Sequence, residues 1–487
     1  MPFANRHHWL ASAGGIALAI SAPSSSARAD TLREALASAY NTNPTLQAAR
    51  ADQRAVDENV PITRADGLPS ASAQGTFTEN IYNSSDSPLT AKRTYNAAAS
   101  LSVPIYSGGA VRNSLRAAKT RVEAGQADLR GTESAIFSQV VGTYMDVIQN
   151  EAVVLLNAKQ VEVLGVNLQS TSDRFEIGDL TRTDVAQSTS RLELAKGNLR
   201  AARSNLAAAR EQYIALVGHA PGDLAPPPPL PGLPESAEEA VSIALESNPD
   251  LIAAQERAAA SHYDIDAAGA GRLPRVELFT TGDYTKQDRG TDPSLGTVFP
   301  NSTRSAVAGV RATIPLFQGG RPAALERQAQ SRSAAAQERE IATERNVIAQ
   351  VRAAWSSWQA ALEIIDSTSV AISAAELSLE GVRAENSVGN RTILDILNAE
   401  QELQSARVQL VQARRNAYVA GFSLLAAMGK AEARDLNLET VGPLYDPQDN
   451  YDRVKGKIFD WSFDPDPEAK STRTVDTATQ SGSVSQP

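Results

Sequence analysis

The feature that most constrains this 487-residue chain is an internal repeat of about two hundred residues. An Asn-Pro pair and a Leu-Pro pair each recur 205 positions later, at 43–44 and 248–249 and at 68–69 and 273–274. Four further landmarks recur 211 positions later: Pro-x-x-x-Gly-Gly from Pro104 and Pro315, Gly178 and Gly389, Asp184 and Asp395, and Gly218 and Gly429. The period is too long for a solenoid repeat, so the chain is interpreted as two copies of one half-molecule.

Two strands are predicted in each half, between the Leu-Pro and Pro-x-x-x-Gly-Gly landmarks. They lie at about 69–82 and 94–104 in the first half, and at about 274–284 and 304–315 in the second. Apolar and polar residues alternate there, which gives each strand one apolar face. A barrel wall that faces lipid needs this pattern over about 9 to 11 residues. The alternation alone does not exclude a soluble hairpin.

Long helices are predicted after each Gly-Gly pair, at about 112–176 and 322–387. In the first of them apolar residues step by three and four without a proline, as in a coiled-coil seam. A 65-residue helix spans about 97 Å at a rise of 1.5 Å per residue, which exceeds the width of a compact domain. The return helices, at about 181–217 and 392–428, are shorter. We therefore expect the helix that begins near Pro249 to complete the return toward the strands.

The sequence predicts a division into repeats, linker and tail. The first repeat covers 30–217, a proline-rich linker covers 218–235, and the second repeat covers 236–429. From 430 to 467 we expect a partly ordered band whose aromatic residues pack against the helices. The polar stretch 468–487 is predicted to be disordered.

Residues 1–29 have the layout of a secretory signal peptide, with an apolar run from Trp9 to Ile20 and cleavage expected after Ala29. The run is too short to span a bilayer, and no longer one follows, so any membrane insertion is expected through strands. Cleavage removes Arg6 and Arg28 but no acid, so the net charge changes from −10 to −12. An acidic chain of this kind is not expected to bind nucleic acid.

Residues that could carry out catalysis are sparse. The chain has no cysteine, and His219 and His262 are the histidines that remain after residue 29, without a partnering cluster. No P-loop, His-Glu-x-x-His motif or strand-linked Gly-x-Gly-x-x-Gly motif occurs. We therefore expect no cofactor and no metal site, and we do not expect an enzyme.

Two helical turns stand out, at 175–185 and 386–396. Each places a glycine at the turn and an aspartate six residues later, as Gly178 with Asp184 and Gly389 with Asp395. A C-capping glycine followed by an acid at the next helix start accounts for each residue singly. It accounts less well for the retention of the whole turn in both halves.

Together, the duplicated Pro-x-x-x-Gly-Gly motifs, Asn-Pro helices and Gly-x5-Asp turns resemble the TolC family of outer-membrane channel-tunnels, over roughly 30–440. The resemblance implies a mainly α fold with a membrane β-barrel, in which three chains give four strands each to a twelve-stranded barrel. It implies a long tunnel in the periplasm whose tip meets an adaptor protein and an inner-membrane transporter of the RND or ABC type. The implied function is passive, gated exit for efflux or type I secretion.

The resemblance also assigns residues to a constriction at the tip. Asp395 corresponds to an acidic residue that lines the entrance, so that three copies form a ring that favours cations. Asn398 stands where a second acid is often found. Gly178 and Gly389 correspond to the turns that form the tip.

Further residues correspond to contacts that hold the tip closed. These are Thr183, Asp184 and Arg391, with Arg391 expected to pair with Asp184. Asn386 replaces a tyrosine that often takes part in this closing network.

A soluble periplasmic coiled-coil scaffold is the alternative function, and an enzyme is a third. The strands discriminate between the first two, because a scaffold has no reason to duplicate four alternating segments near membrane-spanning length.

Overall fold

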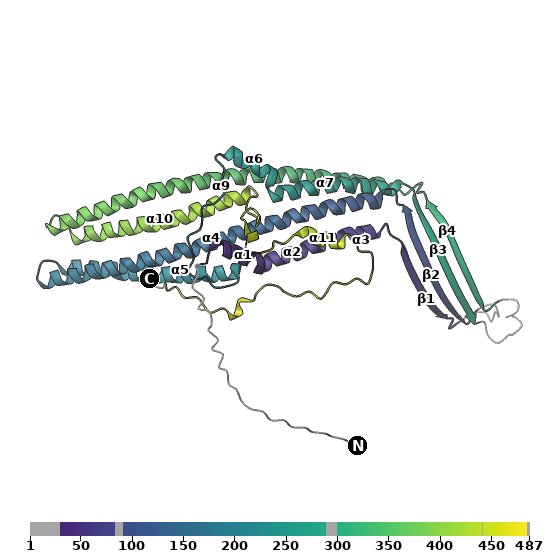
Figure 1. Cartoon of the computed structure of the whole chain (residues 1–487), viewed down its shortest axis with the longest axis horizontal. Coiled ribbons are helices and arrows are strands. Elements are labelled where there is room, and N and C mark those ends of the chain that lie inside the picture. Colours follow the sequence, from purple (N-terminus) through teal and green to yellow (C-terminus); the bar gives the residue numbers. More distant parts are fainter. Residues whose placement is uncertain (1–29, 83–90, 289–299, 441, 485–487) are drawn as a thin grey trace, which may run out of the picture.

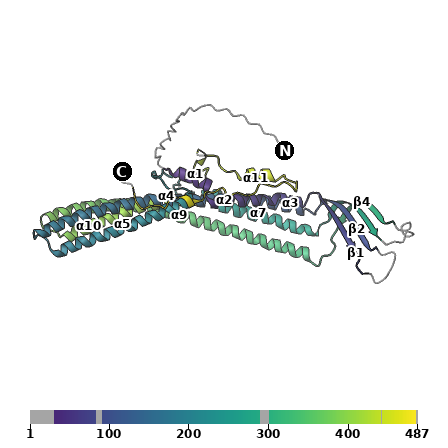
Figure 2. The same ribbon diagram turned by 90° about the horizontal axis from the view of Figure 1, so that it is seen from below.

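The structure is a computed structural model that describes residues 30–82, 91–288, 300–440 and 442–484; the expected signal peptide lies outside these ranges. The chain is elongated, with long helices along most of its length and four strands at one end (Figures 1 and 2). The shorter helices near the N-terminus and in the second half are α1 Leu32–Thr42, α2 Pro44–Asp57, α3 Asn59–Ala65, α6 Ala237–Ser247 and α7 Pro249–Gly269. Among the described residues, no helix combines the length and apolar character needed to cross a membrane.

Two helices of 67 residues each, α4 (Ala110–Glu176) and α9 (Arg321–Ser387), set the length of the molecule. Each would span about 100 Å, and each starts after a Gly-Gly pair whose second glycine has a positive φ, 88° at Gly109 and 80° at Gly320. Their return partners are α5 (Arg182–Val217) and α10 (Ile393–Ala427), and α7 packs against both long helices. The predicted helix ends differ from these bounds by at most two residues.

The strands are β1 Ser70–Glu79, β2 Arg93–Tyr106, β3 Arg275–Asp288 and β4 Ser302–Thr313. They form one antiparallel sheet in the order β1-β2-β3-β4. Its register brings the predicted apolar series onto the same face, since Ala71 lies opposite Leu101, and Leu278 lies opposite both Val103 and Val310. A mainly α fold with four antiparallel strands was predicted from the sequence and is confirmed.

The other face of the sheet is polar. The Ser72 and Ser100 hydroxyls share a hydrogen bond of 2.8 Å across β1 and β2. Ser102 donates to the Glu277 carboxylate at 3.2 Å, and Arg311 pairs with the same carboxylate at 2.7 Å. The sheet therefore separates an apolar face from a face with linked polar side chains.

The duplicated Asn-Pro pairs tie the end of each return helix to the start of an earlier helix of the same half. The Asn43 side chain accepts hydrogen bonds from the first turn of α2, and its amide donates to the Leu216 carbonyl at 3.1 Å, near the end of α5. In the second half Asn248 caps α7 and donates to the Ala427 carbonyl at 2.9 Å. One asparagine thus satisfies two helix ends, which explains why this motif is present in both halves.

Replacing Asn248 by alanine should lower the free energy of unfolding by about 2 kcal/mol. The variant loses the cap of α7 and leaves the Ala427 carbonyl without this donor. The denaturation midpoint in detergent measures the loss. Asn198→Ala, at an exposed position inside α5, is the matched control and should stay within about 0.5 kcal/mol. An equal loss in the two variants would contradict the double-capping role.

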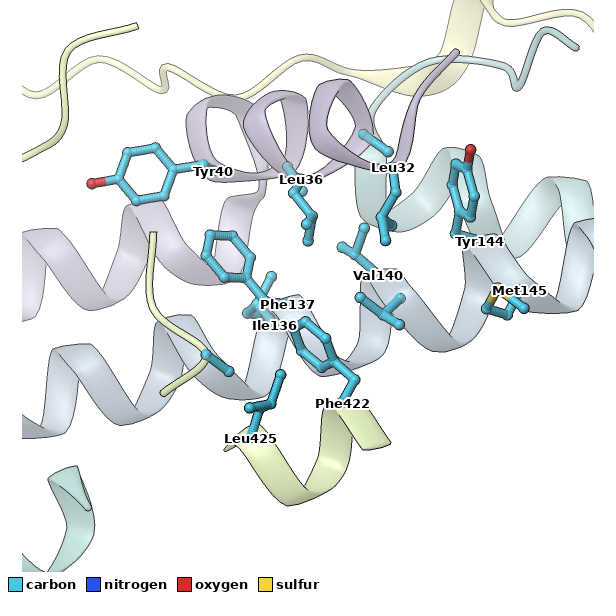
Figure 3. Packing of buried hydrophobic residues seen from close by; sticks show 14 of the residues in the cluster. Leu32, Leu36, Tyr40, Ile136, Phe137, Val140, Tyr144, Met145, Phe422 and Leu425 are labelled. Atoms are coloured by element: carbon cyan, nitrogen blue, oxygen red, sulfur yellow. The ribbon is translucent and has the colours of Figure 1, made fainter. Parts of the chain in front are cut away.

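The main apolar core lies midway along the helices, where α1, α4, α5, α6 and α10 meet. Figure 3 shows Tyr40 and Leu36 of α1 over Phe137 of α4, with Phe422 of α10 beneath. The Tyr144 hydroxyl can donate to the carbonyl of Asp30 at 2.9 Å or of Ala225 at 2.6 Å. The first described residues and the proline-rich linker are therefore held against the same helix.

The C-terminal segment differs from two predictions. Residues 480–484, in the stretch predicted to be disordered, lie against α5, where Arg210 donates to the Ser481 carbonyl at 2.7 Å and Val484 packs on the core. The prediction of disorder rested on polar composition. This segment is held by hydrogen bonds to its backbone carbonyls, which composition does not indicate. The aromatic band was predicted to pack against the helices, but its last three aromatics, Phe459, Trp461 and Phe463, are exposed.

Candidate functional site at the helical tip

The far end of the helices, opposite the strands, carries two turns of the same geometry (Figure 1). After α4, Gly178 has φ 82° and donates to the Phe175 carbonyl at 2.9 Å, while Asp179 donates to the Arg174 carbonyl at 2.9 Å. After α9, Gly389 has φ 84° and makes the equivalent bond at 3.0 Å. Both are Schellman turns, which need a left-handed residue after the helix and so favour glycine.

The aspartates that follow the two turns are helix-capping residues. Asp184 accepts from the Thr181 backbone N–H at 2.9 Å and from its hydroxyl at 2.7 Å. Asp395 accepts from Thr392 at the same two distances. Since each threonine accepts in return from the aspartate N–H, both turns end in a reciprocal capping box.

These hydrogen bonds favour the ionised carboxylates. Bonds from Thr181 hold the pKa of Asp184 below its ordinary value, and bonds from Thr392 do the same to the pKa of Asp395. A depressed carboxyl pKa means that the capping contribution is present above the ordinary pKa and is lost as the pH falls through the lowered one. Both groups are therefore negatively charged at neutral pH.

Within one chain Arg391 is not paired with Asp184, so the expected pair stays a prediction for contacts between neighbouring chains. Its guanidinium contacts Glu385 at 2.7 Å, at the end of α9. The same turn is closed by Asn386, whose amide donates to the Arg391 carbonyl at 2.7 Å. Glu385 lies directly across the turn, whereas the Asp184 carboxylate is engaged by Thr181 on the other hairpin. Thr183 is exposed beside it.

The two hairpins meet at Asn398 and Leu397. Arg191 of α5 donates to the Asn398 side-chain oxygen at 2.8 Å. Leu397 is buried in a cluster with Leu164 and Leu192 of the first hairpin. Sequence reasoning found Asn398 but missed Arg191 and Leu397, because helical periodicity identifies an apolar stripe without showing which helix it faces.

The tip is a charged surface formed by two capped helical turns. Within the described ranges, no group of three His, Asp or Glu side chains is arranged to hold a metal ion. The tip instead combines two glycine turns, two ionised capping aspartates and exposed ion pairs, such as Arg174 with Asp179 at 2.7 Å. Exposed ion pairs contribute little to stability, so these contacts can exchange partners at small cost.

Sequence comparison places the chain among known channels. A family model described as outer membrane efflux protein matches residues 35–219 and 240–430. The outer membrane efflux protein BepC of Brucella suis is 32% identical, over 89% of this chain and 92% of its own length. Outer membrane protein TolC of Escherichia coli is 26% identical, over 86% of each chain.

Solved structures share the fold. The CmeC outer membrane channel of Campylobacter jejuni matches with a TM-score of 0.71 at 17% identity, covering 87% of this chain and 89% of its own. VceC of Vibrio cholerae, an outer membrane protein, matches with a TM-score of 0.70 at 20% identity, covering 82% and 96%. Neither comparison supports the scaffold alternative. The chain therefore belongs to the outer membrane efflux protein family and is an outer-membrane channel of the TolC type.

Proposed function

We propose that three copies of this chain close one duct that carries cargo from the periplasm through the outer membrane. The observation that carries the proposal is the open sheet: among the described strands, β1 and β4 each have one neighbour. Unpaired edges are not tolerated in lipid, and the smallest membrane barrels have about eight strands. Pairing β1 of one copy with β4 of the next gives each strand a second neighbour and, in three copies, a twelve-stranded barrel.

Channels of this family are homotrimers that work with an adaptor protein and an inner-membrane transporter. We assign the contact with the adaptor protein to the helical tip of this chain. Because the sequence lacks a P-loop, we assign the energy supply to an RND-type or ABC-type transporter. Relatives are named for both efflux and protein secretion, including the alkaline protease secretion protein AprF of Pseudomonas aeruginosa at 25% identity. One passive duct suits either cargo.

The two faces of the sheet support an orientation for the barrel. Its apolar face, with Leu101, Leu278 and Val310, is suited to outer-membrane lipid. Its polar face, with the Glu277 and Arg311 pair, is suited to a water-filled lumen.

At the tip, Asp395 contributes one carboxylate per chain to a ring around the entrance. The capping bonds from Thr392 support this role, because they fix the carboxylate and keep it ionised. Asn398 adds no charge and is held by Arg191. Gly178 and Gly389 mark the turns that surround the opening, and Thr183, Asp184 and Arg391 lie where neighbouring chains would meet. The Arg391 pair with Glu385 is exposed, so opening requires an exchange of surface ion pairs.

Asp395→Asn should lower the cation-over-anion permeability ratio several-fold, because it removes the charge of the ring while keeping a side chain that can accept a hydrogen bond. The reversal potential in a salt gradient measures the ratio. Asp446→Asn is the matched control, since Asp446 is an exposed aspartate that caps the helix from Pro447 to Val454, away from the tip. An unchanged reversal potential in Asp395→Asn, or an equal change in the control, would reject the ring.

The mass of the purified protein in detergent tests the assembly. We expect three chains for each particle, measured by light scattering with the detergent contribution subtracted. A folded species of one or two chains would contradict the proposal, because four or eight strands from this chain would leave the tunnel geometry of the family unformed.

A further inference from the structure

The segment after α11 (Pro447–Val454) displays three aromatic side chains to solvent. Phe459, Trp461 and Phe463 are 71%, 75% and 79% exposed, and the rings of Trp461 and Phe463 pack edge to face at 6.5 Å. We call residues 459–463 the aromatic loop. At 150–250 Å² for each aromatic side chain, it exposes on the order of 400 Å² of apolar surface. A patch of this size on a protein surface marks a binding site more often than chance exposure.

The aromatic loop is held in place. Ser462 donates to the Phe459 carbonyl at 3.1 Å, which closes a tight turn. Asp464, just beyond the loop, accepts two bonds of 2.8 Å from Arg453 of α11 and one of 3.2 Å from Lys457. Two cationic side chains thereby balance the charge of Asp464, and their hydrogen bonds join the two ends of the segment that carries the loop.

The helix that precedes the loop, α11, is fixed to α2, which comes before α3 and the first strand. On α11, Asn450 donates to the fully buried Asp57 of α2 at 2.6 Å, and Gln53 donates to the same carboxylate at 2.8 Å. Burial raises the pKa of Asp57, so the two amide donors are the contacts that stabilise it there. This buried network anchors α11 on α2.

The anchor places the loop at the end of the helices from which the sheet rises. Arg64 of α3 donates to the Lys455 carbonyl at 3.1 Å, and the chain enters β1 at Ser70, six residues after Arg64. In both views the yellow segment that follows α11 turns back beside the strand end of α3 (Figures 1 and 2). The loop is therefore near the level at which the chain passes into the membrane.

We propose that the aromatic loop inserts into the inner leaflet of the outer membrane and anchors the helical tunnel to the lipid surface. Three observations favour lipid over a protein partner. The loop lies beside the base of the sheet, whose apolar face the proposed function assigns to lipid, and the inference rests on that assignment. Its aromatic residues are of the types that settle at a membrane interface, and the neighbouring Asp464 is neutralised by Arg453 and Lys457.

The proposal makes the loop a second membrane contact of the same chain, separate from the barrel. Its contact is with the headgroup and acyl boundary of a phospholipid, as expected for rings that penetrate a short distance. This contact between loop and lipid does not depend on the number of chains in the channel. It would brace the upper tunnel against tilting, since the anchor is outside the barrel wall.

Single-cysteine labelling tests the anchor directly, because the full chain has no cysteine of its own. Phe459→Cys and Phe463→Cys, each labelled with an environment-sensitive fluorophore, are placed in phosphatidylethanolamine and phosphatidylglycerol vesicles that contain a lipid-attached quencher. Val475→Cys is the matched control, because Val475 is an 85% exposed apolar residue of the same tail, three residues beyond Thr472, which lies against Gly218. Val310→Cys, on the apolar face of the sheet, reports barrel insertion.

We expect lipid quenching at 459 and 463 to be several-fold stronger than at 475 and comparable to that at 310. Quenching at 310 without quenching at 459 and 463 overturns the anchor while leaving barrel insertion intact. The labels at 459 and 463 are also tested with a water-soluble quencher. Protection from both quenchers overturns the anchor, because such protection places the loop against another protein chain. Absence of quenching at all four positions contradicts membrane insertion as a whole.

Discussion

Gly429→Ala is expected to lower the free energy of unfolding by about 4 kcal/mol or more. Gly429 ends α10 with φ 72°, where an L residue is strained, and a Cβ there would lie 2.3 Å from the Ser247 carbonyl oxygen. It would also lie 2.9 Å from the Cα of Asn248. These are backbone atoms of the α6–α7 junction, so relief requires moving two helix ends. The yield of folded channel and its denaturation midpoint measure the effect.

Gly389→Ala is the matched control for this prediction. Gly389 has φ 84°, but a Cβ there would meet nothing within 4 Å. It should therefore show only the cost of a left-handed residue, about 1 to 2 kcal/mol. Equal losses in the two variants would show that backbone strain, and not the packing of α10 on the Asn248 turn, dominates at Gly429.

Phe137→Ala is expected to lower the free energy of unfolding by about 3 to 5 kcal/mol, the cost of a large cavity in a packed core. Phe137 is fully buried on α4 and lies 6.1 Å from the Tyr40 ring, between centroids. Its loss loosens α1 from the middle of the long helix (Figure 3). Denaturation followed by circular dichroism measures the change.

Phe175→Ala serves as the comparison for the core substitution. Phe175 lies at the end of the same helix and is 42% exposed, so its removal leaves little cavity and should cost about 1 kcal/mol or less. Similar midpoints for the two variants would contradict the assignment of the core to the middle of the helices.

Local periodicity and turn chemistry made most of the fold predictable from the sequence. Alternation over ten or so residues placed the strands, because one sheet face must be apolar over its full width. The long runs that begin after each Gly-Gly pair, proline-free in α4 and with proline only in the first turn of α9, predicted these two helices. The shared role of Asn43 and Asn248 could not be read in the same way, because each asparagine contacts a helix end more than 170 residues away in the chain.

The helical turns of the tip could be predicted from the sequence, but the ion-pair partners of its charged side chains could not. Gly389 and Asp395 follow local rules for helix ends, and the structure places them accordingly. Arg391 has several acids within reach, and the sequence does not rank them. Within one chain Arg391 pairs with Glu385, and its expected pair with Asp184 stays a prediction for neighbouring chains. The exposed aromatic loop was mistaken for packing because aromatic content indicates apolar contact without identifying the partner.

The central claim is that copies of this chain close a channel whose narrowest part is the helical tip. Single-channel recording of the purified, full-length protein in a planar bilayer tests it most directly. We expect a small, cation-preferring conductance that increases when the Arg391 contact is removed by Arg391→Ala. A correctly folded protein that gives no conductance, or a large unselective conductance that Arg391→Ala leaves unchanged, would contradict it.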